Sequence, residues 1–112
     1  MTNTRLEPSV KEQLWNKTFI EKQASLREGM SHERGTFADL VFRMLRSDPT
    51  VTHTYLEDLA VMASGQAKAS LEQGKFTLGL CYLELAHAAT SFGMQKNKME
   101  NWLRELVPAN AK

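Results

Sequence analysis

Apolar residues recur along most of the chain at spacings of three and four, which is the period of an amphipathic α-helix. No window alternates strictly between apolar and polar residues, as a half-buried strand would. The pattern predicts helices over about 9–28, 36–46, 54–73, 75–92 and 97–107. We therefore expect an all-α fold, a compact bundle of about five helices. The third and fourth helices would form a central antiparallel hairpin.

Glycine and proline mark the predicted ends of these helices. Glycine is expected to end the first, third and fourth helices, at Gly29, Gly74 and Gly93. Pro108 is expected to end the fifth, because the residue before a proline avoids the helical conformation. The polar segment 29–35 has a glycine at each end, and it is the predicted hinge of the chain.

The length of 112 residues predicts one helical domain over 1–112, with 1–8 and 109–112 frayed at its ends. Hydrophobic residues make up 42% and charged residues 24% of the chain, which argues against disorder. No stretch approaches the ~20 apolar residues that span a bilayer, and the first residues lack the apolar run of a secretory signal. A cytoplasmic location is expected.

Two of the predicted helices have unusual faces. One face of the third helix is rich in alanine, which lets a neighbouring helix approach closely. The fourth helix is apolar on nearly every side, so it should be buried all round. Because five helices offer little cover for it, we expect a second chain to cover one side, as in a homodimer. The alanine-rich face comprises Leu56, Leu59, Ala60, Ala63, Ala67 and Leu71.

The net charge is +1, and the basic residues are spread along the chain, so direct nucleic-acid binding is not expected. Cys81 is the only cysteine, which excludes an intramolecular disulfide. It lies in the most apolar stretch and is interpreted as a small buried side chain, with a reactive thiol as the alternative.

Groups for catalysis are sparse. Glu84 and His87 stand at the spacing of half a di-iron helical motif, but the other helices offer no second copy. We interpret the two as a hydrogen-bonded polar pair at the edge of the core. No glycine-rich loop for phosphate is present either. The sequence predicts neither an enzyme nor a bound metal or cofactor.

Three patterns could serve binding. The hairpin Tyr55–Phe92 is similar to one tetratricopeptide unit, although any tight helical hairpin uses small residues in the same way. A helix-turn-helix is disfavoured, because Glu57 and Asp58 would meet phosphate at the start of its reading helix. Large apolar residues off the main stripes indicate a protein interface, with core filling as the alternative. The predicted partner-interface residues are Trp15, Phe19, Phe42 and Met94, with Met30 and Met99 near by.

The whole chain resembles the QslA-like family of small antiactivators in size, near-neutral charge and helical content, most of all over 56–92. The resemblance implies a helical homodimer that binds a LuxR-type quorum-sensing regulator (LasR). It also implies that the homodimer covers the dimerisation surface of the regulator, so that the regulator no longer binds DNA. No short motif carries family residues over to single positions. A tetratricopeptide-like adaptor or secretion chaperone is the alternative, and a small DNA-binding regulator is a more distant one.

Overall fold

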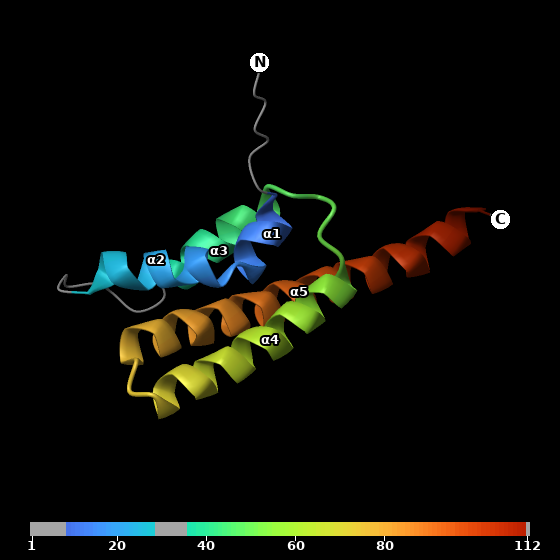
Figure 1. The fold of residues 1–112 in the computed structure, drawn as a ribbon. Helices are drawn as coiled ribbons and strands as arrows, with labels where there is room; N and C mark the ends of the chain where they lie inside the picture. The colour runs from blue at the N-terminus through green and yellow to red at the C-terminus, as the bar shows by residue number, and fades with distance from the viewer. Residues whose placement is uncertain (1–8, 29–35, 112) are drawn as a thin grey trace, which may run out of the picture.

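The computed structural model describes residues 9–28 and 36–111, which form five helices and no strand within these ranges (Figure 1). Helices α1, α2 and α3 lie together on one side of α5, and α4 runs antiparallel along α5 (Figure 1). The expected all-α bundle with a central hairpin is confirmed. The helices are α1 (Val10–Trp15), α2 (Lys17–Arg27), α3 (Thr36–Arg46), α4 (His53–Glu72) and α5 (Phe76–Ala111).

The first predicted helix is in fact two, and Asn16 separates them. Its backbone is extended, and its N–H donates to the carbonyl of Gln13 at the end of α1. Its side-chain oxygen accepts from the N–H of Thr18, 2.8 Å away, at the start of α2. One asparagine therefore caps both helices. The spacing of the apolar residues over 9–28 did not reveal this break. The predicted hinge 29–35 lies outside the described residues.

Helix α3 presents an apolar face to the rest of the bundle. Phe37, Val41 and Leu45 are fully buried, and Leu40 and Met44 are partly buried beside them. These five residues recur at the spacing of one helix face, so α3 packs along α5 through a continuous apolar contact.

The turn between α4 and α5 depends on the backbone conformation of Gly74. Gly74 has φ of +77°, a left-handed conformation that side chains disfavour. The N–H of Lys75 donates to the carbonyl of Ser70, and that of Gly74 to the carbonyl of Leu71. This paired pattern ends a helix tightly and confirms the predicted end of α4.

Small residues hold α4 and α5 close together. On α4, Ala63 and Ala67 are buried, as the alanine-rich face predicted. On α5, the facing positions are Gly79, Ala86 and Gly93, one per seven residues, and all three are buried. A repeat of seven keeps these positions on one side of a helix, so α4 packs along the same line of small side chains.

Helix α5 corrects two predicted boundaries. It runs unbroken through Gly93, where the sequence suggested a stop, and through Pro108 to Ala111. A Cβ at Gly93 would lie 3.5 Å from the Cβ of Leu56, so this glycine serves close packing of α4 rather than helix termination. The apolar residues Trp102, Leu103 and Leu106 of the predicted fifth helix lie outside the described side chains.

Candidate protein-binding surface

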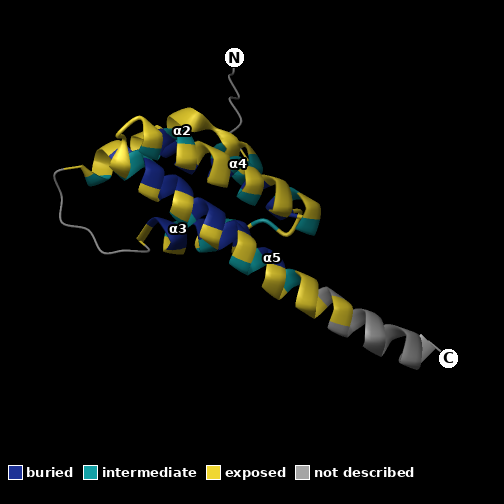
Figure 2. Ribbon diagram, turned by 90° about the horizontal axis from the view of Figure 1, so that it is seen from below, coloured by how far each residue is buried: buried dark blue, intermediate teal, exposed yellow. Residues whose placement is uncertain are grey.

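Helix α5 is central to the bundle, yet one narrow strip of it faces outward. Between Phe76 and Met94, its positions toward α2, α3 and α4 are buried or partly buried, whereas six other positions are exposed (Figure 2). Within the single chain, three neighbouring helices cover most of the circumference of α5 but not all of it. The open face is in keeping with the expectation that five helices offer this helix too little cover, and its burial by a second chain stays a prediction. We call these six positions the α5 row: Phe76, Leu80, Leu83, His87, Thr90 and Met94.

The α5 row is dominated by large apolar side chains. Phe76 is 67% exposed, Leu80 49%, Leu83 44% and Met94 68%. Single exposed apolar residues are common on protein surfaces, but Phe76, Leu80 and Leu83 follow one another along one helix and form a patch. His87 and Thr90 separate this patch from Met94. The row spans ~27 Å, from the rise of 1.5 Å per helical residue. Such a patch is typical of a protein interface.

A groove between α4 and α5 extends the row at the Met94 end. It has a volume of about 320 Å³, and its walls include Val61 and Met94. Val61 is 74% exposed, so the groove adds an apolar side chain of α4 to the row. Small residues of both helices, Ala60, Ala89 and Gly93, also line it. The lining is mostly apolar, although His53 and Glu57 also belong to it, and the groove could take a side chain of a partner.

A second hollow lies at the opposite end of the row, between α2 and the start of α5. It has a volume of about 590 Å³, and Phe76 lies on its wall. Its character is more polar, with Glu21, Glu28 and Lys75 among the residues around it. The α5 row therefore runs from one hollow, at Phe76, to the other, at Met94.

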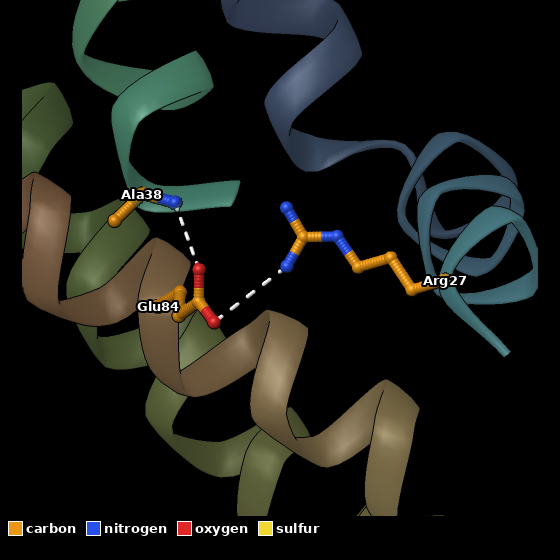
Figure 3. A network of polar contacts seen from close by, with 3 residues as sticks. All are labelled: Arg27, Ala38 and Glu84. Carbon is orange, nitrogen blue, oxygen red and sulfur yellow. Dashed lines mark hydrogen bonds and ion pairs between the residues drawn. The ribbon is translucent and has the colours of Figure 1, made fainter. Parts of the chain in front are cut away.

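Glu84 is the main polar link between α5 and the first helices (Figure 3). Its Oε1 accepts a hydrogen bond of 2.9 Å from the N–H of Ala38, in the first turn of α3. Its Oε2 lies 3.6 Å from Nη1 of Arg27, whose guanidinium sits 5.5 Å from the centre of the Phe37 ring. One carboxylate thus holds the end of α2 and the start of α3 against α5.

The predicted pairing of Glu84 with His87 is not what the structure shows. Glu84 points toward α2 and α3 and is bound by Ala38 and Arg27, whereas His87 is exposed in the α5 row. Within 9–28 and 36–111, no group of three or more His, Cys, Asp or Glu side chains is placed to hold a metal ion. Glu84 serves the packing of the helices.

The four predicted interface residues lie on four different helices. Trp15, at the end of α1, is 45% exposed, and Met94, on α5, lies on the α4–α5 groove. Phe19 and Phe42 are partly buried and pack against the core, so their apolar surface serves the core at least in part. Met94 alone belongs to the α5 row.

Phe76, Leu80 and Leu83 were not among the predicted surface residues. Their signal is present in the sequence: with His87, Thr90 and Met94 they recur at spacings of four and three. This spacing was hidden because the residues between them are apolar too, so the helix looked uniformly buried. Only the positions of α2, α3 and α4 show which apolar face stays open.

Burial makes the most nucleophilic side chain of the chain unreactive. Cys81 is 1% exposed, and burial raises the pKa of its thiol to about 11. The charge of Arg27 lowers this pKa and the charge of Glu84 raises it, and both effects are smaller than that of burial. At neutral pH the thiol stays protonated, which favours a small buried side chain over a reactive group.

Comparisons with protein-family models, with curated proteins and with solved structures gave no match to this chain. In the part of the chain that the structure describes, no helix has the length and apolar character needed to cross a membrane.

Proposed function

We propose that this protein is an antiactivator that sequesters a LuxR-type quorum-sensing transcription factor in the cytoplasm. By covering the dimerisation surface of the regulator, it would prevent the regulator from binding DNA. The observation that carries the proposal is the α5 row, a line of large exposed apolar side chains flanked by a groove. The resemblance to QslA-like antiactivators suggests the class of partner.

The chemistry of the α5 row supports recognition of an apolar protein surface. Binding energy at interfaces concentrates in a few large side chains at a desolvated centre. Leu83 lies next to the centre of the row, Leu80 precedes it, and Met94 offers an adaptable side chain at one end. A dimerisation surface of a regulator is apolar for the same reason, since it must be buried when two copies pair.

Charge favours a protein partner over nucleic acid. The net charge of the chain is +1, and the α5 row contains no lysine or arginine. Phosphate contacts make DNA binding fall steeply with salt, whereas burial of apolar surface depends little on it. The complex with the regulator should therefore persist in moderate salt.

The experiment is a pull-down with the ligand-binding domain of the regulator, repeated with Leu83→Ala, Met94→Ala and Trp15→Ala. Each variant is first checked for native helicity. Truncating a central interface residue typically costs 2 kcal/mol or more, so Leu83→Ala should weaken binding on the order of thirtyfold. Leu26→Ala is the matched control, because Leu26 is 57% exposed on α2, outside the row.

Two results would overturn the proposal. In one, the regulator binds the wild type and all folded variants equally well. In the other, the wild type binds DNA and no regulator. A gel-shift assay gives the functional readout: added protein should release the regulator from its DNA site, and the Leu83→Ala variant should release much less.

A further inference from the structure

Helix α2 is anchored to α5 by few buried side chains. Of its 11 residues only Ile20 and Ala24 are buried, whereas α3, which has the same length, buries four residues, Phe37 among them. Leu26, on the outer face of α2, is 57% exposed. Elements with few buried apolar contacts are the ones that open locally while the rest of a protein stays folded.

The contact between α2 and the start of α5 is also incomplete. The hollow of about 590 Å³ lies between them, with Glu21 and Ser25 of α2 on one wall and Phe76 of α5 on the other. Side chains that line such a space lack contacts on one side, so they add little to the attachment of α2. A polar link across this contact is the ion pair of 3.6 Å between Arg27 and Glu84.

The neighbours of α2 have attachments of their own. The hydroxyl of Tyr55 donates to the carbonyl of Lys11, which ties α1 to α4. The N–H of Ala38 donates to Oε1 of Glu84, which holds α3 on α5 without α2. Asn16, whose backbone is extended, separates α1 from α2. Helix α2 can therefore move as a unit about Asn16 while α1, α3 and α4 keep their places.

Cys81 lies on the side of α5 that α2 helps to cover. It precedes Glu84 by three residues, so the two share one face of the helix. That face is directed toward the end of α2 and the start of α3, where Arg27 and Ala38 bind Glu84 (Figure 3). The thiol is 1% exposed, so a reagent reaches it only when this side of the bundle opens.

We propose that α2 is a gate that moves away from α5 about Asn16 in the native protein, while α3 and α4 stay packed on α5. The open state exposes Cys81 and the apolar side of α5 that the closed state buries. An apolar ligand that binds this side would hold the gate open, because a ligand shifts a protein toward the state it prefers. This inference does not rest on the proposed function.

The test is the rate at which N-ethylmaleimide labels Cys81, the only cysteine, at pH 8 in increasing urea. Opening of α2 alone exposes little surface, so the rate should depend weakly on urea at low concentrations. It should then rise steeply where unfolding of the whole chain takes over. A single steep dependence, with the slope of global unfolding, would mean that Cys81 is exposed only in the unfolded chain and would overturn the proposal.

Two variants locate the movement. Arg27→Met removes the ion pair with Glu84 and should speed labelling in low urea on the order of tenfold. Val51→Ala is the matched control, because Val51 is 1% exposed in the turn between α3 and α4, away from α2. It should lower the urea concentration of global unfolding and leave labelling in low urea unchanged. Equal acceleration by both variants, or none by Arg27→Met, contradicts a gate formed by α2.

Discussion

Tyr55 joins two helices that are far apart in the sequence. Its hydroxyl donates a hydrogen bond of 3.0 Å to the carbonyl of Lys11 on α1, while its own backbone lies in the first turn of α4. Burial, with a smaller contribution from Asp48, raises the pKa of the hydroxyl from 10.0 to about 12. The folded state therefore favours the protonated, hydrogen-bonded tyrosine.

The raised pKa of Tyr55 predicts a loss of stability in alkali. A group with a higher pKa in the folded state stabilises the fold fully below its unfolded pKa, here 10.0. The contribution is lost as the pH rises from 10 toward 12. Urea unfolding at pH 8, 10 and 11 should show this decline, and Tyr55→Phe should make it shallower. An equal decline in Tyr55→Phe would assign the effect to other groups, such as Tyr82, whose pKa burial also raises.

Glu84 is expected to contribute to stability through its two contacts. Glu84→Ala removes the acceptor for the N–H of Ala38 and the partner of Arg27, whose side chain is only 11% exposed. Leaving a partly buried donor unsatisfied costs ~1–3 kcal/mol, so the free energy of unfolding should fall by that amount. Urea denaturation measures it. Glu72→Ala, at the exposed end of α4, is the control and should change stability little. A similar loss in both variants would show that the contacts of Glu84 are not the cause.

At the scale of elements, the presence of each helix could be predicted from the sequence better than the positions of the helix ends. The periodic faces of α3 and α4 identified both helices, because burial of one face needs residues at intervals of three and four. The end of α1 depended on Asn16, and the continuity of α5 depended on Gly93. A glycine in a helical pattern has two meanings, a stop or a close neighbour, and only the position of Leu56 decides between them.

The helical glycines should respond differently to the addition of one methyl group. Gly65 lies in α4, and a Cβ there would meet no atom within 4 Å. Gly65→Ala should therefore raise the free energy of unfolding by up to ~1 kcal/mol, the difference in helix propensity. A Cβ at Gly79 would lie 2.7 Å from Cγ and Cδ2 of Leu71. Overpacking of this kind costs ~1–3 kcal/mol, so Gly79→Ala should be destabilising despite its better propensity.

Thermal and urea unfolding of the two alanine variants provide the measurement. Opposite signs are the expected result. Equal stabilisation by both would mean that Leu71, which is only partly buried, moves aside freely. In that case the close approach of α4 and α5 would not depend on Gly79.

At the scale of the whole molecule, the fold class was predictable from the sequence, but the interaction surface was only partly so. Met94 was among the predicted interface residues, whereas Leu80 and Leu83 were not, because their helix was expected to be buried all round, in part by a second chain. Both assignments followed from the same apolar pattern of one helix. Which of its faces is open depends on how many helices surround it, and a single sequence does not determine that number.

The central place of α5 also affects how the chain is made. Helices α2, α3 and α4 all pack chiefly against α5, which is the last of the five described helices to leave the ribosome. Until residues 76–92 are synthesised, the apolar faces of α3 and α4 have no common surface on which to pack. The nascent bundle should therefore remain unfolded and sensitive to proteases until α5 has been synthesised, and it should fold only once that helix has left the ribosome.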